Sequence, residues 1–118
     1  MAKKIVDVHA HAFDEKIAVK ATKNLHNYYG IKPVADGRLV HLLESAKENN
    51  VDKLILCATA TKPTQVEMIN SYVSTLLSEN TLCLGTLHPD YEKIDEELKR
   101  MKELGLSGIK LHPIFQNF

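Results

Sequence analysis

Four short apolar runs alternate with amphipathic stretches along the chain, and this alternation constrains the fold more than any other feature. The runs are rich in Val, Ile and Leu, as expected for strands that are buried on both faces. The stretches between them repeat apolar residues every three or four positions, which is typical of helices with one buried face. This order predicts an α/β fold with parallel strands joined by right-handed crossovers. The predicted strands are 4–10, 53–58, 82–87 and 108–112.

Residues that favour helix ends mark the boundaries of the predicted helices. Asp14, Asp36 and Asp90 stand where an acidic residue stabilises a helix N-terminus, the last two as N-caps. Gly30 and Gly105 stand where a left-handed residue ends a helix. The predicted helices are 14–29, 37–49, 64–79 and 91–104.

The bulk composition indicates one soluble domain. The chain has 118 residues, with 15 basic and 15 acidic side chains, so charge gives no reason to expect a nucleic-acid or anionic-membrane partner. Its apolar stretches are too short to span a bilayer, and its N-terminus lacks the apolar core of a signal peptide. Cys57 and Cys83 both fall within predicted strands, which indicates reduced thiols in a cytoplasmic protein.

Two histidines follow the first apolar run, at positions 9 and 11. Side chains two residues apart on a strand point to the same face, so both imidazoles are expected to lie on one side of its carboxyl end. Imidazole is a common ligand of transition metals, which makes His9 and His11 candidate metal ligands. Asp7 has the same parity and is expected to orient a histidine or anchor the site. Two histidines can fall close together in a sequence by chance. Here the pair ends an apolar strand that also carries an aspartate, and this combination is more specific than the pair alone.

Three segments together resemble a known family. They are DVHAHAF at 7–13, LGTLHPD at 84–90 and ELGLSGIKLHP at 103–113. They resemble the amidohydrolase superfamily, in particular the amidohydrolase 2 branch of aminocarboxymuconate-semialdehyde-decarboxylase-like proteins. The resemblance covers essentially the whole chain but only the N-terminal half of the family domain. It implies that residues 1–118 form a single partial domain, about half of a TIM (β/α)₈ barrel.

The same resemblance implies a metal-dependent hydrolase that acts on an amide, ester or lactone bond of a small-molecule substrate. His9 and His11 would then hold a divalent metal ion, most readily zinc. In the family a histidine of the fifth strand and an aspartate of the eighth complete the site, and this chain contains neither strand. Because catalytic zinc usually has three protein ligands, we expect the chain alone to bind metal weakly and to be inactive.

Further polar residues stand at the predicted carboxyl ends of the strands, where (β/α)₈ enzymes place catalytic groups. Lys110 and His112 are the candidate catalytic residues, through contact with the substrate. For Lys110, a structural ion pair and a metal-bridging role remain alternatives; for His112, so does a helper-ligand role. His88 is expected to be a hydrogen-bonded residue at a strand end, and Thr59 and Thr61 follow the second strand.

Several alternatives stay open at the level of sequence. The reaction is alternatively a metal-dependent decarboxylation on the same fold, or the chain is a non-catalytic α/β assembly or binding module. Segment 14–29 is either a simple connecting helix or a cover over the mouth of the site. A half barrel would expose strand edges, which predicts self-association or a fragment of a longer protein. The competing fold is an open four-stranded domain with helices on both faces.

Overall fold

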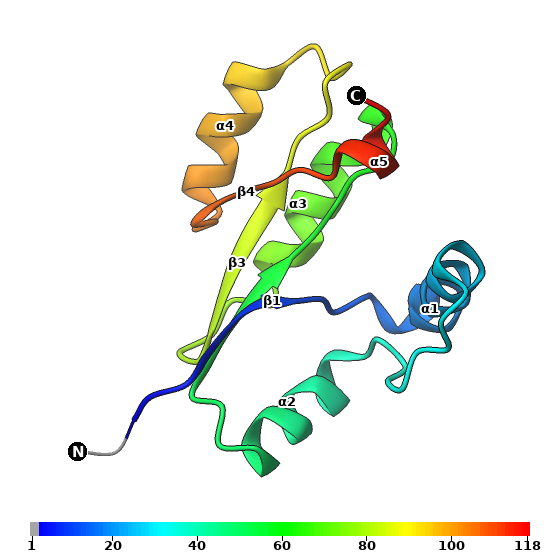
Figure 1. The fold of residues 1–118 in the computed structure, drawn as a ribbon. Helices are drawn as coiled ribbons and strands as arrows, with labels where there is room; N and C mark the ends of the chain where they lie inside the picture. Colours follow the sequence, from blue (N-terminus) through cyan, green and yellow to red (C-terminus); the bar gives the residue numbers. More distant parts are fainter. Residues whose placement is uncertain (1–2) are drawn as a thin grey trace.

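The computed structural model describes residues 3–118 and shows an α/β architecture (Figure 1). The predicted domain begins at residue 1, and its first two residues lie outside the described part. One four-stranded sheet has the order β1-β2-β3-β4, and all three strand pairs are parallel, as predicted. The strands are β1 (Val6–Ala10), β2 (Lys53–Cys57), β3 (Thr81–Thr86) and β4 (Gly108–Lys110). The fourth strand is shorter than predicted, because the chain turns into a helix shortly after Lys110.

The predicted helices are present, and a fifth short helix follows the last strand. The helices are α1 (Glu15–Tyr29), α2 (Leu39–Glu48), α3 (Val66–Ser74), α4 (Ile94–Glu103) and α5 (Pro113–Gln116), with a 3₁₀ turn over Pro63–Gln65. The predicted boundaries of α1 are confirmed. The Asp14 carboxylate accepts from the Lys16 amide, and Gly30 ends the helix with a φ of 68°. Gly105 likewise has a φ of 82°, in the left-handed region.

Two of the predicted N-caps are wrong. Helix α2 begins after Arg38, and the Asp36 carboxylate instead accepts from the Arg38 amide and contacts the His41 ring. Helix α4 begins after Lys93, and Asp90 lies in a turn where its amide donates to His88. Both aspartates therefore stabilise the loop in front of the helix rather than its first turn.

The crossover helices cover one face of the sheet. The strand register places Leu54, Leu56 and Cys83 on the same face, and all three are buried. Val73 of α3 belongs to this core. Partly buried residues of α2 and of the segment that follows α3 pack against it: Leu39, Leu42, Ala46, Leu76 and Leu77. The crossover helices therefore do not alternate between faces, as an open domain with helices on both faces requires.

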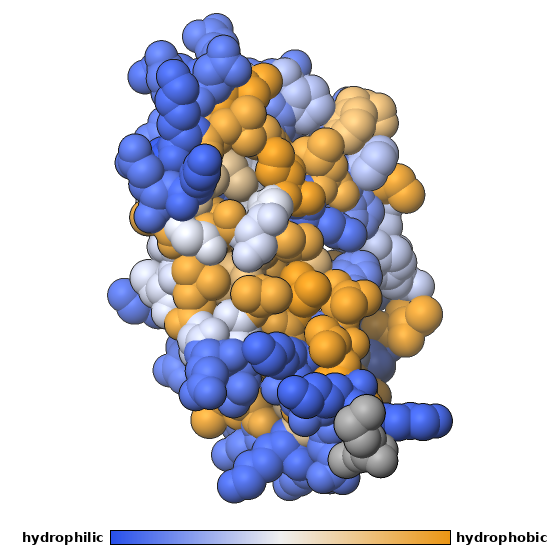
Figure 2. Space-filling view, turned by 90° about the vertical axis from the view of Figure 1, so that its left-hand side faces the viewer, coloured by the Kyte–Doolittle hydropathy of each residue, from blue (hydrophilic) through white to orange (hydrophobic). Residues whose placement is uncertain are grey.

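The opposite face of the sheet is more open. Val6 pairs in register with Lys53, and Ile55 pairs with Leu82, which places these residues on that face. Val6 is 47% exposed and Leu82 is 45% exposed. Figure 2 shows hydrophobic residues gathered across the middle of one side of the molecule, between hydrophilic regions. We refer to the sheet face that carries Val6, Ile55 and Leu82 as the open face.

A buried polar cluster joins α3, β3 and α4. The Asn70 side chain hydrogen-bonds to the backbone of Thr86 and to the Glu97 carboxylate, which is 2% exposed. Arg100 donates to the same carboxylate at 2.8 and 2.9 Å. The cluster fixes the end of β3 relative to two helices.

Two further findings concern the apolar length of the helices and the state of the cysteines. No helix within residues 3–118 combines the length and the apolar character needed to cross a membrane. Cys57 and Cys83 are buried and free, as predicted.

Candidate metal centre

A β-bulge in β1 directs the histidine pair. Asp7 pairs with Leu54 and Ala10 with Leu56, so three steps on β1 match two steps on β2. In a regular strand His9 would share the face of Asp7 and Leu54, which the helices cover. The extra residue reverses the parity and turns His9 and His11 toward the open face.

The two imidazoles do lie together. The ring centroids of His9 and His11 are 5.1 Å apart, and the ring planes are inclined by 59°. Asp7 was predicted to orient a histidine or to anchor the site. In the structure its carboxylate accepts a hydrogen bond from the backbone N–H of His9 at 3.0 Å. Asp7 therefore stabilises the bulge.

Lys110 of β4 also lies at the carboxyl end of the sheet, on its open face; we call this end of the open face the mouth. Thr86 pairs in register with Lys110, so Lys110 lies on the open face. The pKa of the His11 ring is lowered, first by desolvation and then by the positive charges of His9, Lys110 and His112. A hydrogen bond to the backbone of Cys57 acts in the opposite direction. His9 and His11 thus lie side by side, and Lys110 and His112 are near enough to lower the pKa of the His11 ring. His11 therefore stays neutral to a lower pH than a free histidine.

His112 has a second role as the N-cap of α5. Its Nδ1 accepts from the Phe115 amide at 3.3 Å, so in the neutral ring the hydrogen is carried by Nε2. Its own backbone N–H donates to the Gln116 side chain at 2.7 Å, and Gln116 in turn donates to the Ala60 carbonyl at 2.9 Å. This arrangement suits His112 to donate a hydrogen bond to a substrate oxygen rather than to bind a metal.

Aromatic rings lie beside His11 and His112, and sequence reasoning missed them. Phe13 lies nearly parallel to the His11 ring, with centroids 6.5 Å apart. Phe115 stacks on His112 at 4.1 Å and also meets Tyr28 at 4.9 Å and Tyr29 at 6.0 Å. The only sequence signal was the placement of Phe115 one helical turn after His112.

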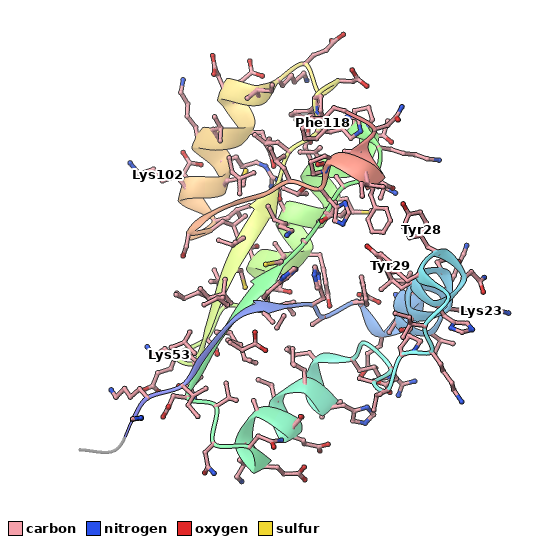
Figure 3. All side chains as sticks on the ribbon, viewed as in Figure 1. Lys23, Tyr28, Tyr29, Lys53, Lys102 and Phe118 are labelled. Atoms are coloured by element: carbon pink, nitrogen blue, oxygen red, sulfur yellow. The ribbon has the colours of Figure 1, made fainter. Side chains whose placement is uncertain are left out.

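The aromatic contacts also define the position of α1. Tyr28 and Tyr29 stand at its C-terminal end, on the side turned toward α5 (Figure 3). Segment 14–29 is thus a regular helix whose last turn contacts Phe115 through Tyr28 and Tyr29. The predicted connecting helix is confirmed, and a role of this segment as a cover over the site stays a prediction.

Other polar residues at the strand ends have structural roles. His88 is buried, and its Nδ1 accepts from the Asp90 amide at 3.2 Å, as expected for a strand-end residue. The Thr61 hydroxyl donates to Gln65 at 3.1 Å and steadies the 3₁₀ turn. Neither residue belongs to the histidine cluster.

The donor set suits a metal ion only in part. Imidazole nitrogens match the preference of zinc and related ions. Within residues 3–118, however, no group of three or more His, Cys, Asp or Glu side chains is arranged to hold an ion. Cys57 lies near Lys110, but burial raises the pKa of its thiol, which therefore stays protonated. The described residues offer two ligands, His9 and His11.

Comparison with known proteins adds no assignment. No protein-family model matches the chain, and neither a curated protein nor a solved structure matches it.

Proposed function

We propose that this chain forms half of a (β/α)₈ barrel and supplies the first two metal ligands of an amidohydrolase-like, metal-dependent hydrolase. The observation that carries the proposal is the pair of His9 and His11 at the carboxyl end of β1, whose ring centroids are 5.1 Å apart. The positive charges of Lys110 and His112 both lower the pKa of the His11 ring, which supports a place for these residues in the same site. Four parallel strands in sequential order, with crossover helices on one face, are what half a barrel requires.

Each residue has a defined part in this proposal. His9 and His11 would hold a divalent ion, most readily zinc, which lowers the pKa of a bound water and polarises a carbonyl. The Nε2–H of His112 donates to an oxygen of the substrate. Lys110 attracts an anionic group, and the aromatic rings limit the access of water. The substrate class is a small molecule with an amide, ester or lactone bond.

A decarboxylase on the same scaffold is the second candidate. The observation that favours it is the positive charge of Lys110 beside the imidazoles, because a cation at the mouth attracts a carboxylate. In either case two protein ligands are fewer than the usual three. We therefore propose that the isolated chain binds metal weakly and is catalytically inactive. The free, buried cysteines support a reducing compartment such as the cytoplasm.

Zinc titration by calorimetry tests the proposal. The wild-type chain is expected to bind zinc weakly, and His9→Ala and His11→Ala are each expected to weaken binding at least about tenfold. His41→Ala is the matched control, because His41 lies on the surface and contacts Asp36. Circular dichroism verifies that each variant is folded.

Three results would contradict the proposal. Absence of zinc binding by the wild-type chain would favour a non-catalytic module. An equal loss in His41→Ala would place the metal elsewhere. Hydrolysis by the pure chain that His9→Ala abolishes would overturn the expected inactivity.

A further inference from the structure

The sheet ends in two free edges that run in the same direction. Within residues 3–118, β1 pairs only with β2 and β4 pairs only with β3. Their outer backbone groups form no ladder, and such edges favour pairing with another strand. The open face beside them carries the exposed side chains of Val6 and Leu82. Edges and face together form one continuous surface.

The chain exposes more surface than a compact protein of its mass. Its accessible area is 8344 Å², whereas a compact monomer of 13.3 kDa exposes about 6,450 Å². Its radius of gyration is 14.8 Å, against roughly 13.5 Å for a compact domain of this length. The excess area is about 1,900 Å², more than the roughly 800 Å² that each partner buries in a standard interface. This excess matches the scale of an obligate interface.

A second copy of the chain offers the complementary edges. Under a two-fold axis along the strands, β4 of each copy meets β1 of the other, and both new strand pairs are parallel. The eight strands then form a closed ring, which is the strand number of a (β/α)₈ barrel and leaves no edge. The formal net charge of zero means that two copies do not repel each other at long range.

We propose that two copies of this chain associate through β1, β4 and the open face to form a two-fold symmetric, eight-stranded parallel barrel. The interface is isologous, with two identical seams between β4 and β1. Residues of the open face such as Ile55 and Leu84 then become the core of the barrel. This inference rests on edges and area, so it does not depend on metal binding.

The mass of the purified chain in solution is the first test. Light scattering after size exclusion is expected to give twice the chain mass of 13.3 kDa. Val6→Lys and Leu82→Lys place a charge on the open face and are expected to shift the protein toward the monomer at least about tenfold in dissociation constant. Met68→Lys is the matched control. Met68 is 65% exposed on α3, so this variant is expected to keep the dimer.

Hydrogen exchange tests the seams directly. Dilution below the dissociation constant of the dimer is expected to speed the hydrogen exchange of the backbone amides of Val6–Ala10 and Gly108–Lys110 together. The exchange rates of α3 amides are expected to stay unchanged. A mass of one chain at all concentrations would overturn the proposal, as would open, growing oligomers. Concentration-dependent protection of helix amides instead of β1 and β4 would also overturn it. Metal-free protein serves throughout, so failure here is distinct from failure of the metal site.

Discussion

The side-chain amide of Asn70 hydrogen-bonds to both the backbone N–H and the backbone C=O of Thr86. Its Nδ2 donates to the Thr86 carbonyl at 2.9 Å, and its Oδ1 accepts from the Thr86 amide at 2.7 Å. Thr86 is the last residue of β3, where the regular ladder ends and the next backbone groups need other partners. One fully buried side chain therefore replaces a strand partner at this end of the sheet.

Replacement of Asn70 by alanine is expected to destabilise the fold strongly. The change leaves the two buried backbone groups of Thr86 without their Asn70 partner and removes one hydrogen bond to Glu97, whose carboxylate still accepts from Arg100. The expected loss in the free energy of unfolding is about 2–4 kcal/mol. Urea denaturation provides the measurement, and Asn80→Ala in an exposed turn is the control, with a change below about 0.5 kcal/mol. Equal losses in the two variants would show that the Asn70 bonds add no stability.

Glu97 is expected to make stability depend on pH in the acid range. Burial alone would raise its pKa, but hydrogen bonds from Arg100 and Asn70 and the charge of Arg100 outweigh burial and lower it. A carboxyl whose folded pKa lies below its ordinary value of 4.5 adds stability above that value. This stability is lost as the pH falls through the lowered pKa.

Urea unfolding at a series of pH values from 7 down to about 3 tests the role of Glu97. The wild-type chain is expected to lose stability across the acid range, and Glu97→Gln is expected to be less stable at neutral pH with a shallower acid dependence. The exposed Glu103→Gln variant is the control and retains the wild-type slope. An unchanged slope in Glu97→Gln would contradict the assignment.

Any side chain at position 85 is expected to destabilise the fold, because the space around Gly85 is filled. A Cβ atom at this position would lie 2.5 Å from Met101 Cε, 2.6 Å from Asn70 Oδ1 and 2.8 Å from Leu106 Cδ1. Gly85→Ala therefore forces the packing of α3 and α4 apart, with an expected loss of about 1–3 kcal/mol. Gly108→Ala is the matched control, because its Cβ would meet only Leu84 Cδ2, at 3.2 Å. Thermal denaturation compares the two, and a smaller loss for Gly85→Ala than for Gly108→Ala would refute this account.

Phe115 is expected to hold the end of α1 against the mouth. Phe115→Ala removes ring contacts to Tyr28 and Tyr29, and aromatic pairs contribute about 0.5–1.5 kcal/mol each. Amides in the last turns of α1 are expected to exchange about tenfold faster, while β2 amides remain unchanged. Phe118→Ala is the control, because Phe118 is 59% exposed. Unaltered exchange in α1 would show that other contacts hold the helix.

The sequence predicted the fold wherever local pattern and tertiary packing agree. Continuous apolar runs such as 53–58 became strands, although the helices bury only one face of the sheet, and periodic stretches became helices. The N-caps at Asp36 and Asp90 were wrong because the helices begin later, after Arg38 and Lys93. The Asp36 carboxylate accepts from the Arg38 amide in the loop, and Asp90 bonds to His88 through its own backbone amide. Helix α3 ended at Ser74 rather than residue 79, because the Thr81 hydroxyl donates to the Leu76 carbonyl and turns the chain.

Of the candidate site, the sequence predicted that the side chains of His9 and His11 lie close together, and their role as metal ligands stays a prediction. Side-chain parity placed His9 and His11 on one side, and the carboxyl ends of parallel strands brought Lys110 and His112 to them. The contacts of Phe115 with Tyr28 and Tyr29 could not be predicted from the sequence. They join Tyr28 to Phe115 across most of the chain, and no local pattern encodes such a contact. The bulge in β1 was also missed, since it depends on how β1 meets β2.

The bulge gives β1 an unequal tolerance to changes in length. Loss of Val8 would restore a regular ladder from Asp7 to Ala10 and still leave both imidazoles turned to the mouth. Gain of one residue at the same point would reverse them toward the helices. Shortening of this strand is therefore expected to be the milder change, and lengthening by one residue is expected to turn the two imidazoles away from the open face.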